Sequence, residues 1–351
     1  MQASETPYQF PVGPKIELPR SFVHDGQTMD FDRFLDETDT AALLVLKDGE
    51  LVYETYWLTG GRDVQWISMS VAKSYISALI GIAVEEGHIR SIEEPITNYT
   101  PSLAGSAYDN VRIKDVLQMS SGASWNEDYS DPNSDMMRFA RAFATGASIN
   151  RYVATLEREF EPGTFNRYNS ADTQALGLLL VNATGRSISD YMEEKLWQPI
   201  GAEAAGHWLL DNKGMELAFG GMTATARDYA KLGELYRLGG QFNGKQIVPA
   251  EWVKASITPD APHLQPGANP DPEFEFGYGY QWWIPESDEG EYAAIGVYNQ
   301  FVYVNPTHHI VIVKLSANRQ YGITDDESSY RELETGTFFR SIVNEVGARW
   351  G

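Results

Sequence analysis

The strongest constraint on this sequence is one long segment that lacks a polar face. Residues 71–84 are apolar on nearly every side of a helix, interrupted mainly by Lys73 and by small Ser, Ala and Gly residues. A helix that is apolar all round is normally buried in the centre of a protein. Two glutamates then return the chain to solvent, and Gly87 is a natural stop. The segment therefore predicts a buried central helix that other elements must cover.

Ser70 and Lys73 lie at the start of this helix, three residues apart, so their side chains are neighbours on one face. The helix dipole is positive at this end, and burial disfavours a charged ammonium. A neutral lysine in this place can act as a base toward the serine hydroxyl. The same spacing also fits a capping serine followed by a lysine that extends to water. The spacing alone leaves both interpretations open.

The charge balance excludes some classes of function. The chain of 351 residues has 49 acidic and 27 basic side chains, for a net charge of −22. A nucleic-acid-binding protein needs a basic surface, and an anionic membrane repels a chain of this charge. We therefore expect neither nucleic acid nor a membrane as a partner.

The absence of cysteine excludes disulfides, thiolate metal sites and a cysteine nucleophile. The six histidines form no H-E-x-x-H motif, and His308 and His309 fall at a predicted hairpin turn. We expect no metal and no cofactor. The N-terminal residues lack the basic start and apolar core of a signal peptide, and no apolar run reaches the roughly 18 residues of a membrane span. This pattern predicts a cytoplasmic protein, or a periplasmic one if a signal segment was removed.

Strand patterns lie toward both ends of the chain, with helical patterns between them. Residues 41–57 predict a hairpin, and residues 292–318 predict strands joined by tight turns. This order indicates an α/β (α+β) protein in which an inserted helical domain interrupts a sheet domain built from both ends. We expect a discontinuous sheet domain of residues 1–95 and 206–351, a helical domain of residues 96–205, and a cleft at their boundary.

A serine nucleophile needs a proton shuttle, an oxyanion hole and a second wall for its cleft. The segment Tyr168-Asn169-Ser170 precedes an apolar helical pattern and offers a tyrosine as the shuttle. A half-buried tyrosine at a helix start is the alternative interpretation. The chain has no G-x-S-x-G elbow and no phosphate-binding glycine loop, which argues against an α/β-hydrolase triad and a nucleotide site.

The order of these motifs resembles that of the penicillin-recognising serine hydrolases. The chain is most similar to the branch containing class C β-lactamases, family VIII carboxylesterases and 6-aminohexanoate-dimer hydrolases. The resemblance rests on SMSVAKS around Ser70, RYNSAD around Tyr168, GGMTATARDYAKLGELYRLGGQFNGKQIVPAEWV, FGYGYQWWIP and AAIGVYNQFVYVNP. It runs from about residue 41 to residue 345. It implies the β-lactamase/transpeptidase-like fold, an antiparallel sheet flanked by helices with an inserted helical domain.

The resemblance also implies roles for individual residues. Ser70 would attack a carbonyl and form an acyl-enzyme, and Lys73 would accept the serine proton, alone or sharing a proton with Tyr168. Tyr168 would pass a proton to the leaving group and then activate water. The backbone N–H groups of Ser70 and Val297 would form the oxyanion hole, and Gly296 would allow close approach of the substrate.

Three further residues are predicted to bind substrate or support the site. Ser170 would support Lys73 or contact the substrate carbonyl, and Trp283 belongs to an aromatic loop that is expected to line a pocket. Tyr129 lies in the segment SWNEDYSDPNSD, which resembles a cleft loop whose tyrosine closes over the substrate. An ordinary surface loop is the alternative for this segment.

Two departures from the family pattern bear on the substrate. Ser170 replaces the asparagine of the Y-x-N motif, and Ala294-Ile295-Gly296 stands where β-lactamases and transpeptidases have K-T-G. The lysine that holds a β-lactam carboxylate is therefore missing, and this segment looks like the amide-hydrolase form. We expect a serine hydrolase of small linear amides or esters, as a monomer or homodimer. A β-lactamase or DD-peptidase and a non-catalytic binding protein are the alternatives.

Overall fold

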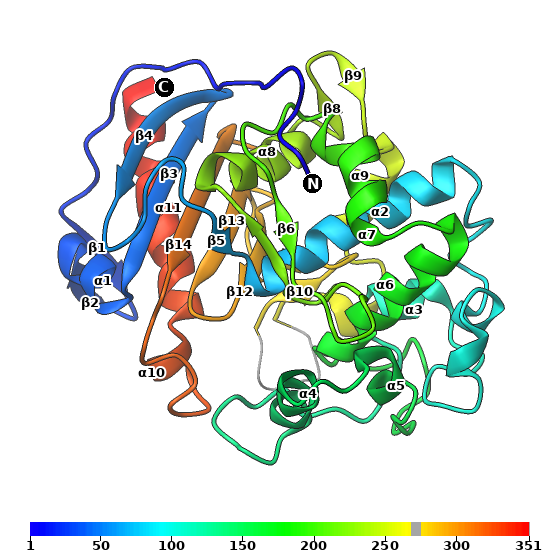
Figure 1. The fold of residues 1–351 in the computed structure, drawn as a ribbon. Coiled ribbons are helices and arrows are strands. Elements are labelled where there is room, and N and C mark those ends of the chain that lie inside the picture. The colour runs from blue at the N-terminus through cyan, green and yellow to red at the C-terminus, as the bar shows by residue number, and fades with distance from the viewer. Residues whose placement is uncertain (268–274, 351) are drawn as a thin grey trace.

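The computed structural model describes residues 1–267 and 275–350 and is built around one antiparallel sheet (Figure 1). The seven strands have the order β10-β11-β12-β13-β14-β3-β4, and every pairing is antiparallel. The strands are β3 (Thr40–Lys47), β4 (Glu50–Tyr56), β10 (Gly277–Tyr278), β11 (Trp283–Ile284), β12 (Tyr292–Gly296), β13 (Gln300–Asn305) and β14 (Ile310–Ser316). The predicted hairpin β3–β4 thus pairs with the predicted strand β14, and the early and late parts of the chain share one sheet.

The remaining elements surround this sheet. Short strands pair as β1 (Ser21–His24) with β2 (Gln27–Asp30), as β5 (Trp66–Ile67), β7 (Met222–Ala224) and β6 (His207–Trp208), and as β8 (Gln241–Phe242) with β9 (Lys245–Gln246). The helices are α1 (Phe31–Glu37), α2 (Ala72–Glu85), α3 (Ile113–Leu117), α4 (Asp135–Ala144), α5 (Ile149–Val153), α6 (Ser170–Thr184), α7 (Ile188–Met192), α8 (Ala226–Arg237), α9 (Ala250–Ser256), α10 (Glu327–Tyr330) and α11 (Glu332–Trp350).

Helices cover both faces of the sheet, which explains the unbroken apolar run in β3. Successive side chains of a strand point to opposite faces. Leu43 and Val45 pack in a buried cluster with Phe338 of α11, whereas Leu44 and Leu46 belong to the cluster that contains α2 and α8. Figure 1 shows α11 and α8 on either side of the strands. A strand buried on both faces needs apolar residues at every position rather than at alternate ones.

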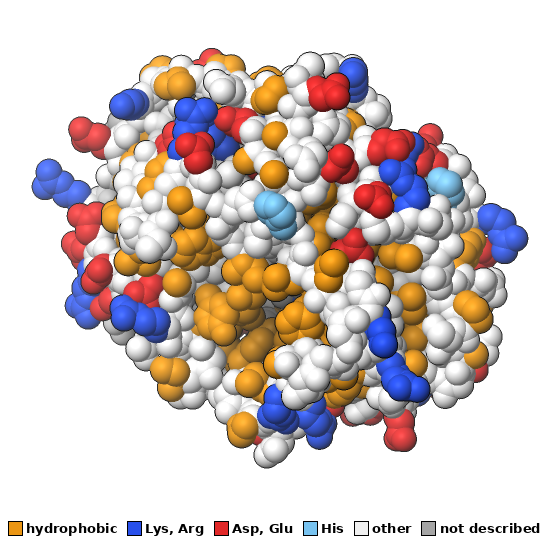
Figure 2. All heavy atoms as spheres, in the orientation of Figure 1, with side chains coloured by type: hydrophobic (Ala, Val, Ile, Leu, Met, Phe, Trp, Pro, Cys, Tyr) orange, Lys and Arg blue, Asp and Glu red, His pale blue; other side chains and the backbone are white. Residues whose placement is uncertain are grey.

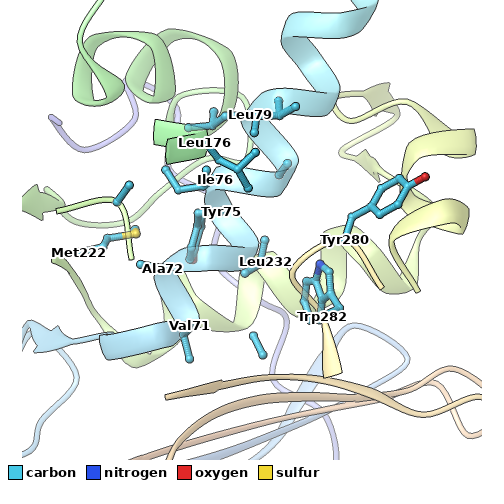
Figure 3. Close-up of a cluster of buried hydrophobic side chains, with 14 of the residues drawn as sticks. Val71, Ala72, Tyr75, Ile76, Leu79, Leu176, Met222, Leu232, Tyr280 and Trp282 are labelled. Atoms are coloured by element: carbon cyan, nitrogen blue, oxygen red, sulfur yellow. The ribbon is translucent and has the colours of Figure 1, made fainter. Parts of the chain in front are cut away.

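The central helix α2 is buried, as predicted. Every residue from Ala72 to Ala83 is buried, and the side chains of α2 contact α6 and α8 (Figure 3). Ile76 and Leu79 lie beside Leu176 of α6 in this cluster. One buried cluster therefore joins the sheet to the helical region, so the helices α3–α7 do not enclose a separate core. The two-domain division by residue number stays a proposal about chain topology.

The start of α2 differs from the prediction in one detail. Ser70 lies in a short 3₁₀ turn, Met69–Val71, and the α-helix itself begins at Ala72. Met69 has a φ of +46°, a backbone conformation that non-glycine residues rarely adopt. Such conformations cluster at functional sites, where surrounding structure holds them in place. Among the described residues, no helix is long and apolar enough to cross a membrane.

Candidate active site

Lys73 contacts Ser70 directly. Lys73 is 1% exposed, and its Nζ lies 2.7 Å from Ser70 Oγ, 3.1 Å from Ser170 Oγ and 3.0 Å from the carbonyl oxygen of Phe219. A neutral amine can accept a hydrogen bond from the Ser70 hydroxyl while it donates to the other two oxygens. The contact therefore excludes the alternative of a lysine that extends to water, because its ammonium group is enclosed.

Burial brings the pKa of Lys73 into the range in which an amine can act as a base near neutral pH. Burial lowers the pKa of Lys73 to about 7, although the negative charge of Glu127 acts in the opposite direction. No carboxylate in the described chain lies within salt-bridge distance of Lys73 Nζ, so nothing holds the amine strongly in its charged form. A base whose pKa lies near the working pH is effective in proton transfer.

The ring of Tyr168 lies beside the Lys73 amine. Its ring stacks on Trp283, with centroids 4.9 Å apart, and the Nζ of Lys73 lies 4.8 Å from the centroid of the Tyr168 ring. Burial raises the pKa of Tyr168 well above its usual value, Tyr278 and Glu127 add to this rise, and a hydrogen bond with Ser70 opposes it. The Tyr168 phenol therefore keeps its proton at neutral pH and can donate it. Lys73 has the lower pKa, so it is the group of the two that is available as a base.

The residue after Tyr168 explains how the motif is positioned. Asn169 caps α6, because its side chain accepts hydrogen bonds from the N–H groups of Ala171 and Asp172 at 2.8 and 3.3 Å. Ser170, the first residue of α6, then presents its hydroxyl to Lys73. The predicted support of Lys73 by Ser170 is thus consistent with the geometry, even though a serine replaces the asparagine of the family motif.

Glu127 belongs to the site, and the sequence analysis did not identify it. Its carboxylate accepts hydrogen bonds from Ser170 N at 3.1 Å, from Ser170 Oγ at 2.6 Å, from the Tyr129 hydroxyl at 2.7 Å and from the Trp125 indole N–H. It therefore connects the loop of Tyr129 to Lys73 through the Ser170 hydroxyl. Glu127 lies two residues before Tyr129 in the predicted cleft loop. The chain has 49 acidic residues, however, so the sequence does not distinguish this glutamate from the others.

A cavity of about 170 Å³ opens over Ser70. The predicted residues Tyr129, Tyr168, Trp283 and Val297 line it together with Ser70. Figure 2 shows this face of the molecule hollowed near its middle, with hydrophobic side chains around the hollow. A cavity of roughly 150 Å³ admits a molecule the size of benzene. The space therefore suits a small acyl or amine group.

Gly296 lets strand β12 pass directly against the turn that carries Ser70. A Cβ atom at Gly296 would lie 2.7 Å from the carbonyl oxygen of Ser68 and 2.9 Å from Ser70 N, closer than real Cβ atoms approach. The Gln300 side chain then holds the end of β12, since its Nε2 donates to the carbonyl oxygens of Val297 at 3.2 Å and Ser316 at 2.6 Å. The backbone at Val297 is thereby fixed beside the nucleophile.

Within residues 1–267 and 275–350, no group of three or more His, Asp or Glu side chains is arranged to hold a metal ion.

Comparison with known proteins identifies the family. The sequence pattern of the family described as Beta-lactamase matches residues 30–335. The chain belongs to the β-lactamase family. A 6-aminohexanoate-dimer hydrolase of Paenarthrobacter ureafaciens is 31% identical to this family member over 296 residues, which cover 82% of this chain and 75% of that one. The protein is therefore a hydrolase, as the motifs predicted.

Solved structures confirm the predicted fold class for this β-lactamase-family protein. A Bacillus anthracis protein provisionally named as a 6-aminohexanoate-dimer hydrolase superposes with a TM-score of 0.86 at 22% identity, covering 99% of this chain and 90% of that one. A family VIII carboxylesterase superposes with a TM-score of 0.64 at 14% identity, covering 90% of this chain and 95% of that one. At these identities the structures establish the shared fold.

Proposed function

We propose that this β-lactamase-family hydrolase cleaves small linear amides or esters through an acyl-enzyme on Ser70. The 2.7 Å contact between Lys73 Nζ and Ser70 Oγ, beside an open cavity, is the observation that carries the proposal. Burial of Lys73 supports it, because an amine with a pKa of about 7 is partly neutral at physiological pH. The name of the relative at 31% identity supports an amide as the bond that is cleaved.

Acylation begins when Ser70 Oγ attacks the carbonyl carbon and its proton moves to Lys73 Nζ. The carbonyl oxygen becomes an oxyanion, which the backbone N–H groups of Ser70 and Val297 stabilise in this proposal. Each donor to an oxyanion contributes roughly 2.7–4 kcal/mol to lowering the barrier. The rigid approach of β12 at Gly296 would hold the two N–H groups at the required separation.

Collapse of the oxyanion breaks the C–N or C–O bond, and the Tyr168 hydroxyl donates its proton to the leaving nitrogen or oxygen. Lys73 returns the serine proton to Tyr168, which lies next to its amine. Water then attacks the acyl-enzyme, gives its proton to the tyrosine–lysine pair, and Ser70 leaves with a proton from Lys73. The raised pKa of Tyr168 suits the donor step of this sequence.

The cavity lining favours a linear substrate over a β-lactam. Ala294 stands where β-lactam-binding relatives carry a lysine, and none of the described lining residues is Lys or Arg. A β-lactam carboxylate would thus enter this cavity without a cationic partner. A small-molecule amide or ester without that carboxylate avoids this cost of burying an unpaired charge.

Three substrates tested side by side distinguish the alternatives. We expect Ser70-dependent hydrolysis of p-nitrophenyl butyrate or of the 6-aminohexanoate linear dimer, with negligible hydrolysis of nitrocefin. Dominant turnover of nitrocefin would instead assign the protein as a β-lactamase. No turnover of any of the three would favour a binding protein on the same fold.

Replacing Gly296 with alanine should lower kcat/KM for the substrate that is turned over by about 100-fold, because displacement of reacting groups by about 1 Å has effects of that size. The added methyl group overlaps the Ser68 carbonyl and Ser70 N, which also destabilises the fold by roughly 1–3 kcal/mol. Steady-state kinetics and thermal unfolding measure the two effects. Gly336→Ala is the matched control: its Cβ meets nothing within 4 Å on helix α11, so full activity and slightly higher stability are expected.

Replacing Glu127 with glutamine should shift the acidic limb of the kcat/KM profile to lower pH. The charge of Glu127 raises the pKa of Lys73, so its removal lets Lys73 lose its proton at lower pH, by about one unit. Glutamine still accepts a hydrogen bond from Ser170. The exposed Glu157→Gln variant controls for the change in net charge and should leave the profile in place. An unchanged midpoint in Glu127→Gln would contradict electrostatic coupling between Glu127 and Lys73.

A further inference from the structure

The turn between β10 and β11 contains a buried glutamine in an uncommon backbone conformation. Gln281 is 2% exposed and has a φ of +63°, which residues other than glycine rarely adopt. Its neighbours Tyr280 and Trp282 belong to the buried cluster around α2 (Figure 3). Such a conformation persists only where the surrounding structure holds it, most often at functional sites. Contacts of Gln281 with other elements must therefore stabilise this turn.

Gln281 joins three helices that are distant from it in the sequence. Its side-chain Oε1 accepts a hydrogen bond from Thr173 Oγ1 of α6 at 2.6 Å, and its Nε2 donates to the carbonyl oxygen of Leu117 of α3 at 2.8 Å. Its backbone carbonyl oxygen accepts a hydrogen bond from Ser74 Oγ of α2 at 2.7 Å. The three partners are each at most 1% exposed, so water does not compete for these hydrogen bonds.

Two of these partners lie next to the proposed acid–base groups in the sequence. Ser74 follows Lys73 in α2. Thr173 follows Ser170 by three residues, which is about one turn of α6. Lys73 Nζ and Ser170 Oγ, 3.1 Å apart, join the same two helices directly. Gln281 is thus a second bridge between α2 and α6, about one turn of α6 from the first.

The same turn positions an aromatic wall of the cavity. Trp283 follows Gln281 by two residues, stacks on the ring of Tyr168 with centroids 4.9 Å apart, and lines the cavity over Ser70. Anchoring the turn to α2, α3 and α6 therefore also fixes where this ring lies. Gln281 itself does not line the cavity, so any effect that it has on the site passes through these elements.

We propose that Gln281 is a positioning residue that sets the separation of α2 and α6 and thereby keeps the Lys73 amine enclosed against Ser170. Loss of this bridge would let the two helices move apart and admit water to the amine. The effect on hydrolysis rests on the proposed function, whereas the enclosure of Lys73 is measurable without turnover. The two can therefore fail separately.

Enclosure is what allows Lys73 to be neutral near physiological pH. Burial is the largest cause of its lowered pKa, and the negative charge of Glu127 acts in the opposite direction. The other groups around the amine are uncharged at neutral pH: the hydroxyls of Ser70 and Ser170, the carbonyl oxygen of Phe219 and the ring of Tyr168. A looser contact between α2 and α6 should therefore raise the pKa of Lys73, because hydration favours the charged ammonium.

Titration of Lys73 by NMR, through an isotope label on its Cε, tests the bridge in the Gln281→Met variant. Methionine matches glutamine in length and lacks its amide, so the side-chain hydrogen bonds to Thr173 and Leu117 are lost. We expect the Lys73 midpoint to rise by about one pH unit. We also expect kcat for p-nitrophenyl butyrate to fall by roughly 10–100-fold, with KM little changed. The Lys73→Met variant assigns the signal.

A second variant and a control separate the bridge from other effects. Gln281→Gly removes the same side-chain hydrogen bonds and relieves backbone strain, because glycine adopts a φ of +63° freely, and it should show the same rise. Gln246→Met is the matched control. The Gln246 side chain also donates to two carbonyl oxygens, those of Gly239 and Val248, but both lie close to it in the sequence. This variant should leave the Lys73 midpoint and kcat in place.

An unchanged Lys73 midpoint in either Gln281 variant would overturn the inference and leave the proposed hydrolysis untouched. An equal rise in Gln246→Met would also overturn it, because general loosening of the fold would then be sufficient. The expected rise in a protein that hydrolyses none of the three substrates would support the bridge and reject the proposed function.

Discussion

Replacement of Ser70 by alanine is expected to lower kcat for ester or amide hydrolysis by roughly 10³–10⁶-fold, the range found when a serine nucleophile is removed. The substitution deletes one oxygen at the cavity wall, and Lys73 keeps its hydrogen bonds to Ser170 and Phe219. The fold should therefore persist, with a thermal unfolding transition close to that of the unmodified protein. In this variant, we therefore expect activity to be lost while the stability of the fold is unchanged.

The measurement is steady-state hydrolysis of p-nitrophenyl butyrate together with mass spectrometry of the protein after rapid acid quench. We expect a mass increment of one acyl group on the peptide containing Ser70, and none in Ser70→Ala. Ser77→Ala is the matched control, because Ser77 is buried in the same helix and does not line the cavity. Full activity of Ser70→Ala would place the nucleophile elsewhere and reject the proposed mechanism.

Local patterns were sufficient to predict the elements that position Ser70. The apolar run of 71–84 could only be a buried helix, and the hairpin around Asp48 and Gly49 was marked by its turn residues, which have positive φ angles of 52° and 79°. The contact between Ser70 and Lys73 also follows from local geometry, because residues three apart in a helical segment share a face. These predictions required no knowledge of how the chain folds back on itself.

Glu127 and Glu332 could not be predicted in the same way. Glu127 becomes part of the site because its loop meets Ser170 at the start of α6, and Glu332 lines the cavity because α11 begins there, so both depend on the order in which distant segments pack. Nothing in the spacing of residues along the chain encodes that order, and acidic residues are abundant throughout. The 3₁₀ turn with a positive φ at Met69 was missed for a related reason, since tertiary contacts rather than local preference stabilise it.

The position of Lys73 leads to the second large effect, on the pH dependence of catalysis. A lysine acts as a base only when it is neutral, and burial places the pKa of Lys73 at about 7. We therefore expect kcat/KM for p-nitrophenyl butyrate to be low at pH 5, to rise tenfold per pH unit, and to level off above about pH 7. Lysine in water, with its pKa near 10.4, would place this rise about three units higher.

Lys73→Met should remove the rise and lower kcat/KM at pH 8 by about 10²–10⁴-fold, the usual contribution of a general base. Lys73→Arg should be equally inactive, because a guanidinium group stays protonated. Glu332 also titrates near this range, and Glu332→Gln separates the two groups: with a neutral ester as substrate, its profile should keep the midpoint near pH 7. If the midpoint moved with Glu332 and not with Glu127, the pH dependence would report on the cavity carboxyl group, and Lys73 would not be the base that activates Ser70.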